Sequence, residues 1–288
     1  AQIALSYGAK LLSLHNKPEG WVGKTWACQN GADAAGGELL LFLDADVRLG
    51  KNGINRLLQA YSDSGCTVSV QPYHKTEQFH EQLSMLFNLV QIAGNGTALP
   101  KPLNVGLYGP VILIAHSDYI KVGGHGSVRK NVVEDMALGL QLRKTGLRYR
   151  LYIGDEEIAF RMYSEGLRSL LQGWTKNFAT GAVKTPLQVF IMTFLWIASL
   201  TSVPLQLIKA TLSANLLWMV IYSALYILWI LVLFILLKHI GHFQIWAFIF
   251  YPILIITLLG VSTISIIKRT FGFKVIWKGR AVDPRGKL

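Results

Sequence analysis

Apolar residues follow two different patterns along this chain. Before residue 166, short apolar runs alternate with amphipathic stretches and with turns rich in Gly, Asp and Asn. This pattern predicts a domain of mixed helices and strands, an α/β fold. After residue 185 come three long apolar stretches, 186–208, 212–237 and 243–267. Each reaches the roughly 20 residues that cross a bilayer core, so we expect a membrane-bound helical region.

The most apolar short run is Leu-Leu-Leu-Phe-Leu at residues 39–43. It predicts a strand that is buried on both faces, as in a parallel sheet. Asp44 and Asp46 follow it, and residues two apart on a strand share a face. Their carboxylates are therefore expected to converge at the sheet edge where open α/β sheets bind ligands. Because Asp is also common in turns and helix caps, the pair alone leaves a metal site and a simple turn equally open.

The remaining periodicities predict the other elements of the first domain. Strands are expected at 9–14, 67–71, 111–114 and 149–153, and helices at 27–35, 53–63, 136–144 and 164–181. A further apolar helix is expected at 79–93, and two locations are possible for it. It would either pack in the core or lie at the membrane surface and bind an apolar acceptor.

Several polar residues stand where a ligand could bind, and each has an ordinary structural explanation. Lys24 opens a predicted helix, where free N–H groups favour a phosphate, or it is a solvated lysine. Glu134 and Asp135 begin another helix, where carboxylates also complement the helix dipole. The Gly-Gly pair ending at Gly124 lets the backbone turn sharply beside a ligand. Trp174 precedes the apolar region, as a membrane-interface anchor or as a ring that stacks on a sugar.

Charge divides the chain where hydropathy does. Of the 16 acidic residues, all but Asp283 lie at or before Glu165, and residues 166–282 carry only basic charges. The net charge of +12 does not indicate nucleic acid, because the basic residues form no stripe interleaved with aromatics. They flank the apolar stretches instead, with Lys176 and Lys184 on one side and residues 268–280 on the other. The positive-inside rule places both flanks in the cytoplasm.

Three complete crossings would put these flanks on opposite sides of the membrane. We therefore expect one stretch to be re-entrant or interfacial, and the candidate is 186–208, which contains Pro204 and several Gln, Ser and Thr residues. The predicted organisation is a cytosolic domain at 1–185, membrane segments at 186–267 and a basic cytosolic tail at 268–288.

Two thiols, Cys28 and Cys66, lack the spacing of a metal site or a disulfide framework and fit a reducing cytosol. The chain does not begin with Met, and residues 1–14 look like the middle of a domain. We expect an amino-terminal portion to precede them.

The order of motifs resembles that of the family 2 inverting glycosyltransferases with a GT-A fold, over nearly the whole chain. The shared features are a buried strand ending in Asp-x-Asp, a Gly-Pro strand, a Gly-Gly turn, Glu-Asp at a helix start and Gln-x-Trp before membrane segments. Four longer runs look like the membrane-bound carotenoid glycosyltransferases that act on 4,4'-diaponeurosporenoate in staphyloxanthin-type pathways. They are Ser-Val-Gln-Pro-Tyr-His at 69–74, Phe-Arg-Met-Tyr-Ser-Glu-Gly at 160–166, Gly-Trp-Thr-Lys at 173–176 and Trp-Lys-Gly-Arg at 277–280.

The resemblance implies roles for individual residues. Asp46 would hold Mg²⁺ or Mn²⁺ against the diphosphate of a nucleotide sugar, with Asp44 near the ribose or the metal. Asp135 would be the general base that takes the acceptor's proton during in-line attack. The residues implied for contacts with the diphosphate or an acceptor carboxylate are Lys24, Arg161 and Lys176. Those implied for the sugar and acceptor are Gly124, His125, Glu134, Gln172 and Trp174.

The implied activity is the inverting transfer of a sugar, glucose from UDP-glucose, to a lipophilic acceptor, the carboxylate of a carotenoid acid. The protein would be a multi-pass protein of the cell membrane with its catalytic domain in the cytoplasm. The Gln-x-x-Arg-Trp form of processive synthases is here Gln172-Gly173-Trp174, which weakens polymer synthesis. The family's first strand and its Asp-containing turn, which bind uracil, have no counterpart at the start of this chain. Either the chain is a fragment or its nucleotide pocket is incomplete.

Three other classes of function stay open at this point. A polysaccharide or lipid-phosphate glycosyltransferase would use the same acids with a different acceptor. A non-catalytic membrane protein could carry a degenerate transferase domain. A small transporter is the weakest of the three, because ionisable residues are missing from the interior of the apolar stretches.

Overall fold

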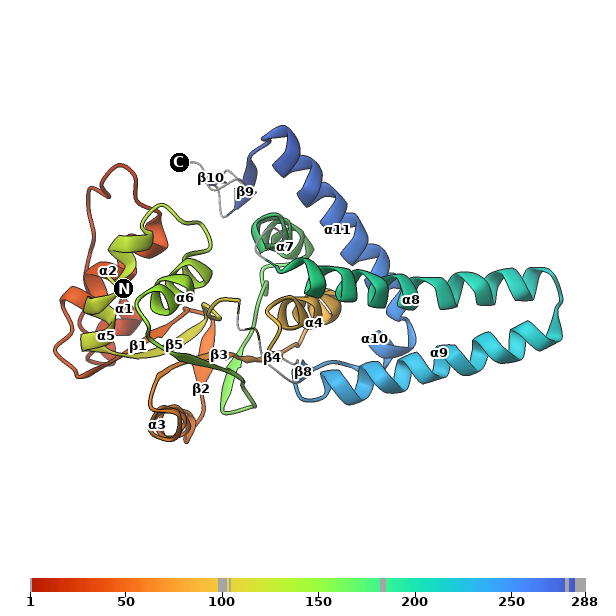
Figure 1. Ribbon diagram of the computed structural model, residues 1–288, viewed down its shortest axis with the longest axis horizontal. Helices are drawn as coiled ribbons and strands as arrows, with labels where there is room; N and C mark the ends of the chain where they lie inside the picture. Colours follow the sequence, from red (N-terminus) through yellow and green to blue (C-terminus); the bar gives the residue numbers. More distant parts are fainter. Residues whose placement is uncertain (1, 98–102, 104, 182–184, 278–279, 283–288) are drawn as a thin grey trace.

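The computed structural model describes residues 2–97, 103, 105–181, 185–277 and 280–282. A mixed α/β domain is followed by long apolar helices, so the predicted fold class is confirmed (Figure 1). The helices of the domain are α1 (Gln2–Ser6), α2 (Gly23–Asp33), α3 (Gly53–Ser64), η1 (Phe79–Ser84), α4 (Met85–Gly94), α5 (His116–Lys121), η2 (His125–Val128), α6 (Glu134–Lys144) and α7 (Leu167–Gly181). Residues 9–14, expected as a strand, form none.

The main sheet has the strand order β1-β5-β3-β6. Its strands are β1 (Leu39–Leu43), β5 (Val111–Ala115), β3 (Thr67–Gln71) and β6 (Tyr149–Ile153). The expectation that residues 39–43 form a doubly buried strand of a parallel sheet is wrong. β1 is an edge strand, antiparallel to β5, and only its Leu40 is buried. An apolar run specifies a strand, but its neighbours in space decide how far it is covered.

A second sheet joins the domain to the apolar helices. Its order is β2-β7-β4-β8, with β2 (Val47–Leu49), β7 (Ile158–Phe160), β4 (Tyr73–Lys75) and β8 (Gly241–His242). β8 lies between two of the apolar helices in sequence and pairs with β4 in parallel. The helical region is therefore hydrogen-bonded to the domain. A short hairpin of β9 (Val275–Trp277) and β10 (Arg280–Val282) follows the last apolar helix.

Alternating side chains of β5 divide the domain into two cores. Ile112 and Ile114 pack with residues of α5 and α6 on one face, and Val111 and Leu113 pack with Leu57 of α3 on the other. This is the period of two that a strand imposes. A third core lies between η1, α4, α7 and the apolar helices. The helix expected at 79–93 belongs to this core, because five of the apolar side chains of α4 are buried.

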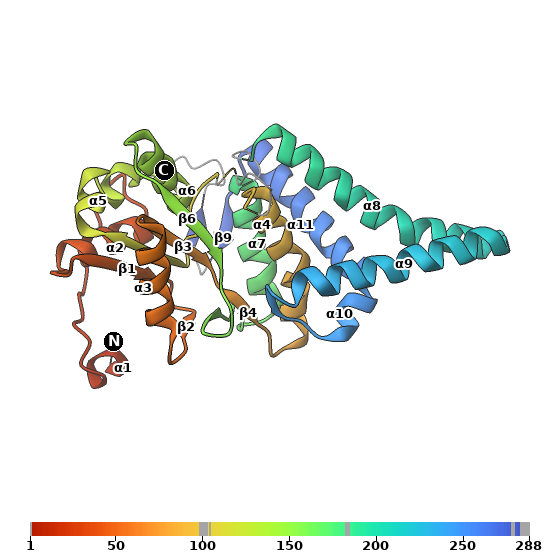
Figure 2. The same ribbon diagram turned by 60° about the horizontal axis from the view of Figure 1, so that its bottom comes forward.

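Three helices are long and apolar enough to cross a membrane: α8 (Leu187–Leu212), α9 (Leu216–Leu237) and α11 (Tyr251–Phe271). α8 and α9 form an antiparallel hairpin that projects away from the domain (Figures 1 and 2). The stretch expected to be re-entrant is thus one continuous helix, with Pro204 inside it. α10 (Ile245–Ile249) leads into α11, which packs against α7 and α4.

Candidate functional site

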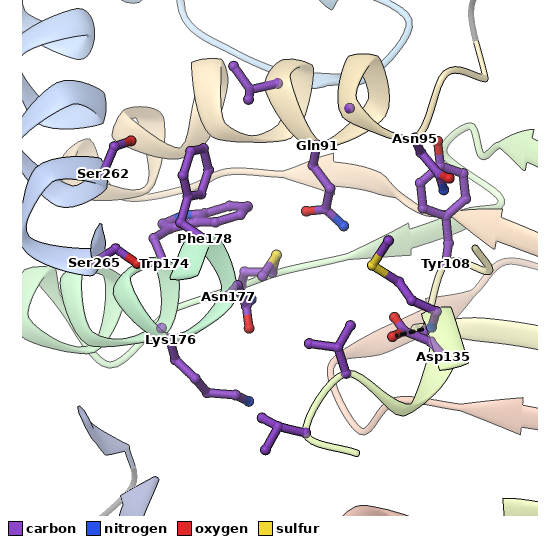
Figure 3. Close-up of a pocket in the computed structure, with 18 of the residues that line it drawn as sticks. Gln91, Asn95, Tyr108, Asp135, Trp174, Lys176, Asn177, Phe178, Ser262 and Ser265 are labelled. Atoms are coloured by element: carbon purple, nitrogen blue, oxygen red, sulfur yellow. Dashed lines mark hydrogen bonds between the residues drawn. The ribbon is translucent and has the colours of Figure 1, made fainter. Parts of the chain in front are cut away.

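A cavity of about 2010 Å³ lies where the α/β domain meets α7, α8 and α11. The three acids predicted to form the centre of the site, Asp44, Asp46 and Asp135, all line it. Pockets for single small molecules enclose roughly 300–1,000 Å³. The cavity therefore has room for two substrates. Figure 3 shows Asp135 at one side of it and side chains of α7 at the other.

The Asp-x-Asp segment is a turn held in place by two neighbouring strands. The Asp44 N–H donates to the carbonyl of Pro110, just before β5, at 2.9 Å. The Asp46 carbonyl accepts from the N–H of Arg161, just after β7, at 3.3 Å. Both carboxylates consequently border the cavity, although from a turn and not, as expected, along one face of a strand.

Lys24, in the first turn of α2, links the two acidic segments. Its ammonium lies 2.8 Å from Asp44 Oδ1 and 2.8 Å from Glu134 Oε1. Burial alone would lower the pKa of Lys24, but the surrounding carboxylates raise that pKa above its ordinary value. The lysine is therefore positively charged and is held by two carboxylates at the edge of the cavity. Its two ion pairs place the end of β1 beside the start of α6, the juxtaposition that the motifs predicted.

Asp135 occupies the second residue of α6 and faces the cavity. Its Oδ1 accepts the N–H of Met136 at 2.7 Å. Burial and the neighbouring Glu134 raise the pKa of Asp135 to about 6, against the opposing effect of Lys24. A raised pKa brings a carboxylate closer to the range in which it accepts a proton efficiently. The position thus suits a general base, in addition to any interaction with the helix dipole.

Gly109 is a residue of the site that sequence reasoning did not single out. A Cβ atom added to it would lie 2.6 Å from Asp135 Oδ2. Only glycine leaves room for the carboxylate in its observed position. The available signal was the Gly-Pro dipeptide directly before the strand at 111–114.

The candidate ligands for a divalent cation are Asp46, which is exposed at the cavity, and Asp44. Within the described part of the chain, no three His, Cys, Asp or Glu side chains gather as a metal site. Mg²⁺ typically binds proteins through one or two carboxylates and fills its remaining positions with phosphate and water. The two carboxylates therefore fit a cation that is bound together with a diphosphate.

Arg161 borders the cavity, but its guanidinium is held by other residues. Its Nη2 lies 2.8 Å from Glu81 and its Nη1 lies 2.5 Å from Glu77. Glu81 is completely buried, so it needs this partner. Arg161 thus neutralises a carboxylate of η1, and its contact with a diphosphate or an acceptor stays a prediction.

Gly124 and His125, predicted as a wall beside the sugar, do not border the cavity. His125 is buried, and its Nδ1 lies 2.8 Å from the hydroxyl of Tyr119. Burial lowers the pKa of His125 to about 4. A Cβ on Gly124, whose φ is +53°, would meet the Tyr119 ring at 2.7 Å. The Gly-Gly turn therefore permits close packing behind the acidic cluster.

Trp174 fits neither of the two functions considered from sequence. Only 1% of it is exposed, its indole N–H donates to Ser84 Oγ at 3.1 Å, and its ring stacks on Phe87 at 4.8 Å. It is a core residue whose edge reaches the cavity. Gln172, also expected at the acceptor, does not border the cavity.

Lys176 of α7 and Tyr163, shortly before α7, also border the cavity. Lys176 is partly buried, and its ammonium points across the cavity toward the start of α6 (Figure 3). Tyr163 has a φ of +60°, a conformation that is unfavourable for residues other than glycine. A Cβ on Gly173 would collide with its ring, so Gly173 is required there.

Comparisons with known proteins agree on one class. The family model described as Glycosyl transferase family 21 matches residues 9–286. A protein of Staphylococcus aureus strain USA300, called 4,4'-diaponeurosporenoate glycosyltransferase, is 34% identical over 97% of this chain and 76% of its own length. The protein of the same name from strain MRSA252 is 33% identical over the same shares. The predicted resemblance to membrane glycosyltransferases is confirmed.

Proposed function

The chain belongs to glycosyl transferase family 21 and is a glycosyltransferase, and from this premise we propose that it transfers glucose from UDP-glucose to the carboxylate of an apolar carotenoid acid. The observation that carries the proposal is the single cavity, which joins Asp44, Asp46 and Asp135 to the membrane-type helices α8 and α11. A polar donor and an apolar acceptor would meet there. The acceptor named for the Staphylococcus aureus relatives has both an apolar chain and an acid group.

In the proposed reaction, an acceptor oxygen attacks the anomeric carbon from the side opposite the diphosphate. A new carbon–oxygen bond forms while the bond to the diphosphate breaks, and UDP leaves with the electron pair, which inverts the configuration. Asp135 takes the proton of a neutral acid, whereas an acid that is already ionised needs no base. Asp46 and Asp44 would hold Mg²⁺ or Mn²⁺, which supplies positive charge to the leaving diphosphate when bound. Lys24 adds a fixed charge beside them.

We also propose that the enzyme is a multi-pass protein of the cell membrane and that its α/β domain faces the cytoplasm. The three apolar helices support association with a membrane. A nucleotide sugar is a cytoplasmic metabolite, and the cavity lies between the α/β domain and the helices. Lys238 caps the end of α9, and Lys268 and Arg269 lie in the last turn of α11; the positive-inside rule favours the cytoplasm for such basic helix ends.

The test is an assay of the complete protein in membranes, with labelled UDP-glucose and a panel of carotenoid acids, lipid phosphates and oligosaccharides. We expect label in an ester of the carotenoid acid, and we expect Asp46→Ala and Asp135→Asn each to abolish it with membrane insertion intact. Label in a lipid phosphate or a polymer would exclude the proposed acceptor. Undiminished turnover in both variants would exclude the proposed site.

A further inference from the structure

The cavity does not end at the acids but continues as a groove between α8 and α11. On α8 five of its lining residues recur at every third or fourth position: Phe190, Phe194, Ile197, Thr201 and Leu205. Such positions form one stripe along a helix. Fifteen residue steps of about 1.5 Å make the stripe roughly 22 Å long. This face of α8 is long enough to follow an extended chain well into a bilayer.

The opposite wall of the groove comes from α11, where Leu258, Ser262 and Ile266 repeat at the same spacing. Several hydroxyls on the two walls already have hydrogen-bond partners within the protein. Thr201 Oγ1 donates to the carbonyl of Ile197 at 2.7 Å, and Ser262 Oγ donates to that of Leu258 at 2.7 Å. With these hydroxyls paired and most of the remaining lining apolar, the groove suits a hydrocarbon chain.

The inner end of the groove has the opposite character. There the cavity wall carries Asp135 and Glu134, and Lys176 extends toward them from α7 (Figure 3). Burial lowers the pKa of Lys176, while the nearby carboxylates oppose this effect. A second carboxylate entering beside Asp135 would be repelled unless a cation accompanied it. Lys176 supplies that positive charge at the end of the groove nearest Asp135.

We propose that the groove between α8 and α11 binds the hydrocarbon chain of an acceptor that enters sideways from the bilayer, and that Lys176 pairs with its terminal carboxylate. Lys176 would then determine the preference for a long-chain acid over the corresponding alcohol. This inference rests on the proposed transferase function. The occupant is an apolar monocarboxylate, because the groove is mainly apolar along its length and the Lys176 ammonium stands at its inner end.

Tryptophan substitutions in the complete protein test the groove. Thr201→Trp and Ser262→Trp would fill it, whereas Leu195→Trp and Ile256→Trp lie on the same helices, do not border it, and replace side chains that are 60% and 71% exposed. With a long-chain acid as acceptor, we expect kcat/KM to fall at least about tenfold in the first pair only. A short-chain acid should be used equally by all four variants. Equal effects in both pairs would overturn the proposal that the groove binds the acceptor's chain.

A second assay tests Lys176 with a long-chain acid and the primary alcohol of the same chain. We expect Lys176→Met to raise KM for the acid about tenfold or more while the alcohol is used as before, and Lys176→Arg to restore most of the preference. An unchanged preference in Lys176→Met would overturn the assignment. Release of UDP by the wild-type enzyme with any acceptor distinguishes a failure of the proposed function from a failure of this inference. Its complete absence refutes the proposed function, whereas active enzyme with unaffected groove variants refutes only this inference.

Discussion

Asp135 lies among charges that act on it in opposite directions. Burial and Glu134 raise its pKa to about 6, and Lys24 opposes them. Between the ordinary pKa of 3.8 and about 6, the folded protein therefore binds a proton that the unfolded chain does not. Folding stability accordingly decreases as the pH rises through this range. At neutral pH the charged side chain costs folding free energy, which is common for residues held in place for a reaction.

Asp135→Asn should therefore abolish transfer and raise the thermal midpoint at pH 7 by a few degrees. The stabilisation should shrink toward pH 4, where the wild-type carboxyl is protonated. Thermal unfolding in detergent at pH 7 and pH 5 measures both effects. Asp63→Asn on the exposed face of α3 is the control and should change neither. A lower midpoint for Asp135→Asn at pH 7 would show that the carboxylate stabilises the fold.

Gly109→Ala should impair the reaction without removing any reactive group. The new Cβ would lie 2.6 Å from Asp135 Oδ2 and displace the carboxylate. A shift of about 1 Å in a reacting group can cost about 100-fold in rate. We expect kcat to fall by that order with protein yield in membranes unchanged. Gly36→Ala, where a Cβ meets nothing within 4 Å, serves as the control. A normal kcat for Gly109→Ala would show that the Asp135 carboxylate can move away from the new Cβ without loss of function.

The motifs predicted which acids meet, but not how the basic and aromatic residues are used. Asp44, Asp46 and Asp135 follow from their positions at the end of an apolar run and the start of a helix. Arg161 was assigned to a substrate because its buried partner, Glu81, lies 80 residues away in sequence. His125 and Trp174 are similar cases, since their packing depends on elements that sequence spacing does not bring together.

At the scale of elements, η1 depends on one buried carboxylate. Glu81 Oε2 accepts the N–H groups of Glu77 and Gln78 at 2.6 and 3.0 Å, and its Oε1 pairs with Arg161. These bonds close the segment that leads into α4. Because α4 packs against α8 and α11, the carboxylate of Glu81 helps to position the helices on this side of the cavity.

Arg161→Met should therefore act as a folding defect more than as a catalytic one. It would leave Glu81 charged and unpaired inside the protein, at a cost of about 3–5 kcal/mol. The double variant Arg161→Met/Glu81→Gln should recover part of this loss, as chemical denaturation would show. Arg56→Met removes an exposed ion pair with Asp155 and should cost less than about 1 kcal/mol. If Arg161→Met were as stable as the wild type, Arg161 would not be needed to neutralise Glu81, and its role would be contact with a substrate.

Apolar periodicity located the elements of the domain well, because local spacing determines them. The strands predicted at 67–71 and 149–153 have those bounds in the structure. The position of β1 at the sheet edge was not predictable, because pairing depends on which strands approach it. The stretch at 243–267 divides into α10 and α11 at Phe250, a break that Pro252 in the first turn of α11 marks in the sequence.

At the scale of the whole molecule, the arrangement of the apolar helices offers a solution to the charge problem raised by the sequence. Three crossings would separate the basic flanks, yet Lys176 and Lys274 border the same cavity. Lys184 and Lys278 lie outside the described residues. α8 and α9 leave the domain and return to it, whereas α11 packs on α7, α4 and η1 (Figure 2). We infer that the hairpin crosses the membrane and that α11 lies at its cytoplasmic interface.

This topology predicts which positions an impermeant maleimide reaches in intact cells, after Cys28 and Cys66 are replaced by Ser. Ser213→Cys, in the exposed turn between α8 and α9, should be labelled from outside. Ile245→Cys, in α10 before α11, and Thr270→Cys, in the last turn of α11, should both be labelled only after permeabilisation, because both ends of an interfacial helix stay on one side. If Ser213→Cys also needed permeabilisation, the hairpin would be re-entrant. If Ile245→Cys and Thr270→Cys differed, α11 would be a third crossing, and the basic residues after it would lie opposite Lys176.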